Sequence, residues 1–124
     1  MVDIVIATRN PKKFRELKIL MATPRVRWRS LESAPQIPSI AERGRTFRAN
    51  AVTKARVVAR ATGHLAIADD SGLMVEALDG APGVRSARFG GLHSDDAANN
   101  GKLLRALADV PLSRRRARYH CVLA

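Results

Sequence analysis

A short apolar run that ends in two adjacent carboxylates most limits how this chain can fold. Residues 65–68 read Leu-Ala-Ile-Ala and predict a buried strand, and Asp69 and Asp70 follow directly, ahead of the turn dipeptide Ser71-Gly72. An α/β protein commonly places a metal ion or a general base at such a strand end. Neighbouring side chains of a strand point to opposite faces, so one acid should face a cleft and the other should pack behind it. A solvated strand end with a capping aspartate explains the pair equally well.

The beginning of the chain predicts a second polar site after a strand. Residues 3–7 form a nearly continuous apolar run, which indicates a central strand. Asn10 is a good N-cap, Pro11 suits the first helical position, and apolar residues then recur at helical spacing to about residue 21. A strand-turn-helix of this kind offers free backbone N–H groups, and Lys12 and Lys13 are close by, so we predict an anion site. It lacks the glycine-rich signature of a P-loop.

The next predicted helix carries polar residues on its apolar side. Thr46 can cap a helix that runs to about residue 61 and ends at Gly63. The expected apolar face is formed by Phe47, Ala51, Val58 and Ala61. Asn50 and Lys54 fall inside the same arc. A lysine there is costly unless it meets an anion, and snorkelling to the edge of the face is the alternative of equal weight.

The remaining pattern alternates strands with helices and predicts an α/β fold with a mixed, mainly parallel sheet flanked by helices. Further strands are expected at residues 26–30, 73–78, 86–89 and 119–124, and a further helix should open at Ser94 with two aspartates in its first turn. Residues 31–45 form a long connection, and connections of that length are often functional. A chain of 124 residues is expected to form one domain, residues 1–124.

The charge of +11 is concentrated in the first half of the chain. Residues 1–63 carry 14 basic and 4 acidic residues, a net of +10, whereas the rest carry 8 and 7. This asymmetry suits a polyanion held beside a metal, or nucleic acid, although a general preference for arginine explains part of the total. Aromatic residues make up only 4% of the chain, so no stacking platform for nucleic acid is evident.

Several classes of protein are disfavoured by what the sequence contains. No apolar run reaches the ~20 residues that a membrane span needs, and no signal peptide is visible. A single cysteine, Cys121, excludes an internal disulfide and a cysteine-based zinc site, and three scattered histidines predict no metal site. A cytoplasmic location is the default expectation.

Three stretches together resemble the inosine-triphosphate pyrophosphatases, a family that acts on ITP, dITP and XTP. They are Ala7-Thr8-Arg9-Asn10-Pro11-Lys12-Lys13, then Thr46-Phe47-Arg48-Ala49-Asn50-Ala51 with Lys54-Ala55, then Ile67-Ala68-Asp69-Asp70-Ser71-Gly72-Leu73. The third continues to Gly80-Ala81-Pro82-Gly83 and Ser86-Ala87-Arg88. Order and spacing match over essentially the whole chain.

The resemblance implies a role for each matching residue. It implies that the triphosphate is held by Thr8, Arg9, Asn10 and Lys13, and that Ser71 also contacts the substrate. It implies that Lys54 reaches the phosphates, that Asp70 activates the attacking water, and that Glu42 and Asp70 bind Mg²⁺. Only the resemblance singles out Glu42.

The implied function is the hydrolysis of nonstandard purine nucleoside triphosphates to the monophosphate and pyrophosphate, by a homodimer and without a membrane partner. The resemblance also implies a further C-terminal segment that holds the base, with Phe-Gly-Tyr-Asp-Pro and Ser-His-Arg stretches that residues 1–124 do not contain. Two alternatives stand beside this reading: a related nucleotide pyrophosphatase with another base preference, and a basic nucleic-acid-binding module without catalysis.

Overall fold

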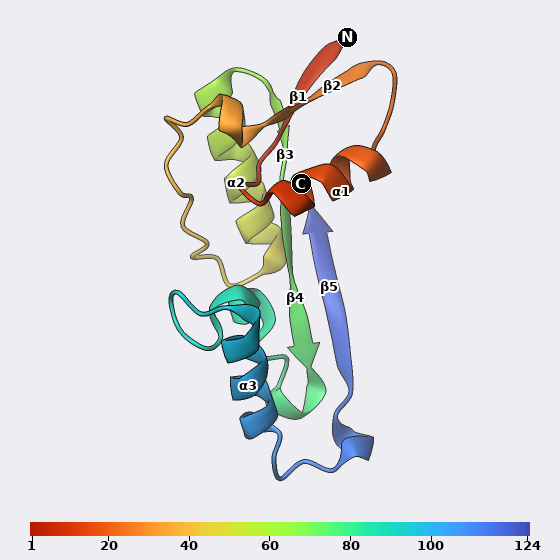
Figure 1. Cartoon of the computed structure of the whole chain (residues 1–124), viewed down its shortest axis with the longest axis vertical. Coiled ribbons are helices and arrows are strands. Elements are labelled where there is room, and N and C mark those ends of the chain that lie inside the picture. Colours follow the sequence, from red (N-terminus) through yellow and green to blue (C-terminus); the bar gives the residue numbers. More distant parts are fainter. The chain divides into compact units, whose positions relative to one another are not determined.

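A computed structural model describes residues 1–124, apart from the side chain of Ser33. The chain divides into two compact units, Met1–Asp69 with Leu123–Ala124, and Asp70–Val122. Figure 1 shows the whole chain in sequence colours. The expectation of one domain for residues 1–124 stays a prediction.

The first unit is built on a parallel three-stranded sheet, which confirms the expected α/β class. Its strands are β1 (Val2–Ile6), β2 (Val26–Ser30) and β3 (Leu65–Ile67), in the spatial order β2-β1-β3. The register pairs Ile6 with Ser30 on one side and with Ile67 on the other. All three strands therefore end at the same edge of the sheet.

Two helices connect these strands. α1 (Pro11–Leu20) links β1 to β2, and α2 (Phe47–Thr62) lies between β2 and β3. Because crossovers between parallel strands are right-handed and the chain moves first to one side of β1 and then to the other, the helices lie on opposite faces. Figure 1 shows them on either side of the strands.

Both helices begin and end as the sequence predicts. Asn10 caps α1 and Pro11 is its first residue, while Thr46 caps α2 by accepting a hydrogen bond from the Ala49 amide at 3.0 Å. Gly63 ends α2 with φ of 70°, a left-handed conformation that glycine adopts without steric cost.

The hydrophobic core of the first unit lies between α2, the sheet and the start of the long connection. Its buried members are Val5, Ala7, Leu31, Ala34, Ile37, Val58 and Ala68. Ala61, which was expected on the apolar face of α2, is instead exposed. Leu20 at the end of α1, one of the apolar residues that recur at helical spacing, is 73% exposed. Both lie in the last turn of their helix.

Strand β2 holds two polar groups of interest. The Nε1 atom of Trp28 is buried and has no hydrogen-bond partner among the groups that the structure describes. Arg29 donates from Nε to Asp3 Oδ2 at 2.8 Å, and this bond is the main reason that the pKa of the Asp3 carboxyl lies below its usual value.

The second unit contains a two-stranded ribbon of β4 (Asp69–Val75) and β5 (Ala117–Leu123), which run antiparallel in Figure 1, and the helix α3 (Asp96–Ala106). The predicted turn at Ser71-Gly72 is wrong, because both residues lie inside β4. The interruption instead falls at Ala68, between β3 and β4. Pairing with β5 supplies backbone partners that outweigh the local turn preference of Ser-Gly.

Three other local expectations are corrected in the second unit. The predicted strand at 73–78 ends at Val75 and gives way to a 3-10 helix, Glu76–Leu78. The predicted strand at 86–89 is part of another 3-10 helix, Gly83–Arg88, in which the Ser86 hydroxyl donates to the Gly83 carbonyl at 2.6 Å. The cap of α3 is Asp95 and not Ser94, because Asp95 Oδ1 accepts the Ala98 N–H at 2.8 Å.

Within the part of the chain that the structure describes, no helix is both long enough and apolar enough to cross a bilayer.

Candidate functional site

The carboxyl ends of β1, β2 and β3 bring three chain segments to one edge of the first unit. Residues 8–13 follow β1, the connection 31–45 follows β2, and Asp69 follows β3 after one residue. In doubly wound sheets, ligands bind outside the carboxyl ends at the point where the strand order reverses. Here β1 lies between β2 and β3, so that point is the end of β1.

The turn after β1 is closed by its own side chains. Asn10 Oδ1 accepts hydrogen bonds from the backbone N–H groups of Lys12 at 2.9 Å and Lys13 at 3.4 Å. The backbone N–H of Asn10 donates to Thr8 Oγ1 at 3.2 Å. The expectation of free first-turn N–H groups is therefore wrong for Lys12 and Lys13. An anion would have to displace the Asn10 side chain from these amides or bind to side chains around them. A pocket of about 240 Å³ beside the turn, lined in part by Thr8, Arg9, Asn10 and Arg15, provides space for it.

Arg9 reaches across to the long connection. Its guanidinium Nη2 donates a hydrogen bond to the carbonyl of Ile37. Ile37 is buried in the core, so this bond ties the turn after β1 to the connection after β2. The substrate-binding role of Arg9 stays a prediction.

Lys13 lies between two carboxylates. Its ammonium is 3.3 Å from Glu16 Oε2 and 3.7 Å from Asp69 Oδ2. The Asp69 side chain is 13% exposed and that of Glu16 is 57% exposed, so the pair with Asp69 is the better shielded from solvent. The structure thus brings a predicted phosphate ligand together with the first of the two adjacent acids.

Glu42 and Lys54 form a direct ion pair. Lys54 Nζ donates to Glu42 Oε1 at 2.8 Å, and the two side chains are 16% and 28% exposed. Of the two explanations for a lysine in the apolar arc of α2, the structure favours the one in which it meets an anion. The long connection therefore brings the Glu42 carboxylate to α2, whereas the roles that the resemblance implied, Glu42 as a magnesium ligand and Lys54 as a phosphate contact, stay predictions.

Asp70 and Ser71 lie on β4 and alternate in burial. Asp70 is 5% exposed, whereas Asp69 and Ser71 on either side of it are half-buried. The two acids thus point to opposite faces of the strand, as the sequence predicts, with Asp69 in an ion pair and Asp70 buried.

No group of three or more His, Cys, Asp or Glu side chains gathers into a metal site among the described residues. Glu42 belongs to the first unit and Asp70 opens the second. Carboxylate oxygens are nevertheless the donors that Mg²⁺ prefers, and this ion is usually held by one or two carboxylates together with substrate phosphates and water. The donor chemistry of Glu42 and Asp70 therefore fits magnesium.

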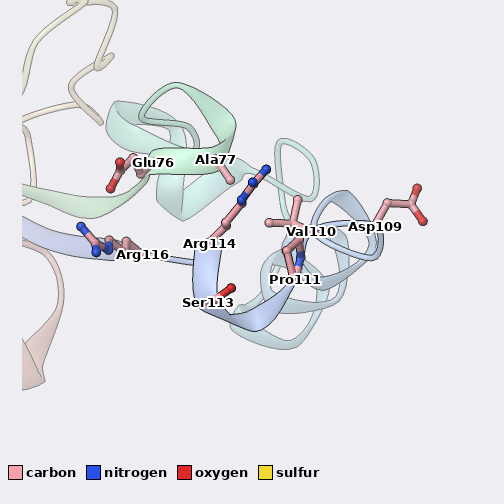
Figure 2. A pocket seen from close by; sticks show the side chains of 8 residues that line it. All are labelled: Glu76, Ala77, Asp109, Val110, Pro111, Ser113, Arg114 and Arg116. Atoms are coloured by element: carbon pink, nitrogen blue, oxygen red, sulfur yellow. The ribbon is translucent and has the colours of Figure 1, made fainter.

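A larger pocket in the second unit contains none of the predicted site residues. It has a volume of about 530 Å³ and is shown in Figure 2, where the Arg114 side chain extends toward Ala77 and the Asp109 carboxylate points away. Its charged lining residues are Glu76, Asp109, Arg114 and Arg116. The two acidic and two basic residues have formal charges that cancel, so the lining carries no excess of basic residues.

The chain that forms this site is similar to known proteins. The sequence model of the Ham1 family matches residues 4–124 of this chain. The chain belongs to the Ham1 family.

Curated relatives of this Ham1 chain carry one shared name. The dITP/XTP pyrophosphatase of Geobacillus kaustophilus is 51% identical over 124 residues, an alignment that covers 100% of this chain and 61% of the relative. That of Geobacter sulfurreducens is 48% identical over 124 residues, covering 100% of this chain and 62% of the relative. The chain thus spans about three fifths of the length of these relatives, at 61% and 62%.

Solved Ham1 structures share the fold. A HAM1 protein from Coxiella burnetii superposes with a TM-score of 0.90 at 41% identity, covering 100% of this chain and 62% of that one. The dITP/XTP pyrophosphatase from Mycobacterium abscessus gives 0.82 at 40% identity, covering 99% and 71%. The family resemblance drawn from the three motifs is therefore confirmed.

Sequence reasoning missed two contacts in this Ham1 site. It assigned no partner to Asp69, whose contact with Lys13 links segments 56 positions apart and leaves no local signal. It also gave no role to Asn50, which is only 2% exposed and is hydrogen-bonded to Gly44. In that case a signal was present, because Asn50 falls in the apolar arc beside Lys54.

Replacement of Lys54 by Met should separate the effect of its charge on turnover from the effect of its packing on stability. Met has a similar volume and suits an apolar arc, so we expect the stability of the Lys54→Met variant to stay within about 1 kcal/mol of the wild type. Turnover should fall by roughly 10²–10³-fold if Lys54 offsets charge on the triphosphate. Thermal unfolding and pyrophosphate release would be measured, with the exposed Arg56→Met on the same helix as the control. Unchanged turnover with lower stability would make Lys54 a packing residue.

Proposed function

We propose that this chain is the phosphate- and metal-binding part of a Mg²⁺-dependent nucleoside triphosphate pyrophosphatase. The proposed substrates are the nonstandard purine nucleotides dITP, XTP and ITP, and the products are the monophosphate and pyrophosphate. The observation that carries the proposal is the alignment with proteins named dITP/XTP pyrophosphatase, at 51% and 48% identity over all 124 residues.

The phosphate groups would be bound at the edge formed by the carboxyl ends of β1 and its neighbours. Thr8, Arg9, Asn10 and Lys13 would bind them there, where the N-terminus of α1 and the basic side chains favour an anion. Support comes from the pocket beside the turn, which includes Thr8, Arg9 and Asn10 in its lining. Ser71 on β4 would add a hydroxyl contact.

Magnesium would be held by Glu42 and Asp70. When bound, it would supply positive charge for the phosphate oxygens and make an attacking water more acidic. Two carboxylates leave room for the phosphate oxygens and waters that complete its preferred coordination.

Asp70 would accept the proton from the water as the water oxygen attacks the α-phosphorus. A bond forms between that oxygen and phosphorus, the bond from the α-phosphorus to the bridging oxygen breaks, and pyrophosphate leaves with the electron pair. Lys54 and Lys13 would offset the charge that develops on the leaving group. The proton passes from Asp70 to solvent, which restores the carboxylate.

Location and assembly are proposed from the resemblance. A cytoplasmic homodimer is the form in which we expect the protein to act, because its proposed substrates belong to the nucleotide pool. A related pyrophosphatase with another base preference is the remaining enzymatic alternative.

The test is a survey of nucleotide hydrolysis. The chain, extended at Ala124 by the corresponding C-terminal segment of a Ham1 relative, would be incubated with dITP, XTP, ITP, ATP and GTP, with and without Mg²⁺. The products would be resolved by chromatography. We expect Mg²⁺-dependent conversion of the 6-oxo purine triphosphates to monophosphate and pyrophosphate. Release of inorganic phosphate and the nucleoside diphosphate would contradict attack at the α-phosphorus. Absence of any turnover, with salt-dependent retention on DNA or RNA, would favour the nucleic-acid-binding alternative.

A further inference from the structure

The connection that carries Glu42 is anchored at its beginning by the hydrophobic core. Leu31, Ala34 and Ile37 are buried, each with an exposed fraction of 6% or less, and Ile40 packs against the same cluster. The hydrogen bond from Arg9 to the Ile37 carbonyl adds a polar anchor. The connection is therefore held as far as Ile40, two residues before Glu42.

The end of the connection is held by a buried asparagine on α2. Asn50 Oδ1 accepts a hydrogen bond from the Gly44 amide at 2.7 Å, and Asn50 Nδ2 donates to the Gly44 carbonyl at 3.4 Å. Asn50 is 2% exposed. A buried amide side chain that binds both the backbone N–H and the backbone C=O of one residue holds the two peptide groups on either side of that residue in position.

Gly44 fits this contact because it has no side chain. A Cβ atom at this position would lie 2.5 Å from Asn50 Oδ1 and 3.0 Å from the Ala49 Cβ atom. The first distance is shorter than non-bonded atoms tolerate, the second is a tight contact, and Asn50 is packed within the protein. Any larger residue would therefore push the connection away from α2.

Glu42 lies between these two anchors. Asn50 and Lys54 are four residues apart on α2 and thus lie on the same face of the helix. One holds the backbone of the connection through Gly44, and the other holds the Glu42 carboxylate at 2.8 Å.

We propose that Asn50 is a positioning residue that fixes Glu42 beside Lys54 by binding the backbone N–H and C=O of Gly44. Its further consequence, which rests on the proposed function, is that the Glu42 carboxylate is held ready for magnesium. Partners that orient a metal ligand in this way typically contribute ~10–100-fold to metal affinity.

The test compares two variants that break the contact from opposite sides. Asn50→Leu keeps the side-chain volume and removes both hydrogen bonds, whereas Gly44→Ala leaves α2 unchanged and displaces the connection. Thr46→Ala is the matched control, because it removes the cap of the same helix and leaves Asn50 and Gly44 in place. Thermal unfolding of all three would show that each is folded and would report any general loss of stability.

Two measurements would be made on each protein. Hydrogen exchange of residues 40–45 reports how firmly the connection is held, and water-proton relaxation with Mn²⁺ reports metal affinity. We expect faster exchange and about 10–100-fold weaker Mn²⁺ binding in Asn50→Leu and Gly44→Ala, with neither change in Thr46→Ala.

Wild-type exchange at residues 40–45 in both Asn50→Leu and Gly44→Ala would overturn the proposal, and so would equal changes in Thr46→Ala. If exchange rises and Mn²⁺ affinity is unchanged, the positioning of Glu42 for a metal is overturned. A wild-type protein that binds no Mn²⁺ and hydrolyses no nucleotide would refute the proposed function. The exchange data would still decide whether Asn50 holds the connection.

Discussion

An Asp70→Asn variant is expected to keep its fold and to lose nearly all metal-dependent turnover. The substitution preserves the shape of a side chain that is 5% exposed and removes one negative charge and the proton acceptor. Loss of a general base alone typically costs about 10²–10⁴-fold in rate, and the loss of a metal ligand adds to it. Circular dichroism and Mg²⁺-dependent pyrophosphate release from ITP would be measured together, on a protein that carries the C-terminal segment of a Ham1 relative after Ala124.

Asp79→Asn is the matched control for this variant. Asp79 belongs to the same unit, is exposed, and has φ of 52°, a conformation that asparagine also tolerates. Its turnover should equal that of the wild type. Near-normal turnover in Asp70→Asn would exclude Asp70 as both the base and an essential metal ligand.

The second large effect concerns discrimination between substrates that differ in their purine base. We expect the 124-residue chain alone to hydrolyse nucleotides poorly and to discriminate little between ITP and ATP. The residues that we propose to bind the phosphates are present, but the family resemblance assigns recognition of the purine edge to a further C-terminal segment. A site that hydrogen-bonds a substrate group can reject an analogue lacking it by about 10⁴–10⁵-fold, and such selectivity requires those polar groups to be present.

The measurement compares this chain with a version fused at Ala124 to the corresponding C-terminal segment of a Ham1 relative. Pyrophosphate release from ITP, XTP, ATP and GTP would be followed for both, and we expect the fusion to gain rate and preference for the 6-oxo purines. Tyr119 and Leu123 of β5 are 73% and 49% exposed, so size-exclusion chromatography must first exclude aggregation of the short chain. Strong ITP selectivity from the well-folded short chain would place base recognition within residues 1–124.

The elements of the first unit could be predicted because their signals are local. Asn10 and Pro11 mark the start of α1, and Thr46 and Gly63 bound α2, since caps and left-handed ends depend on single residue types. The paired acids and the lysine in an apolar arc were likewise visible, because each is an exception to its surroundings.

The second unit was harder to predict because its structure depends on distant partners. Ser71-Gly72 has a strong local turn preference, yet both residues lie in β4, paired with a strand 46 residues further along the chain. Ser86 accepts the Leu73 amide at 2.9 Å, a contact that favours the 3-10 helix over the predicted strand. The ion pair of Glu42 with Lys54 could not be predicted, because nothing in residues 31–45 alone indicates which side chain will reach Lys54. The family resemblance singled out Glu42 only as a magnesium ligand.

The position of Trp28 gives this protein a built-in optical reporter. It is the sole tryptophan, it lies on β2 of the first unit, and its indole nitrogen is buried. The sole tyrosine, Tyr119, lies on β5 of the second unit and is 73% exposed. Indole emission moves to longer wavelength when water reaches the ring, so a fluorescence shift on denaturation reports opening of the three-stranded sheet. Tyrosine absorbance follows the ribbon of the second unit. Coincident transitions of the two signals would show that both units unfold as one cooperative body, and separate transitions would give each its own stability.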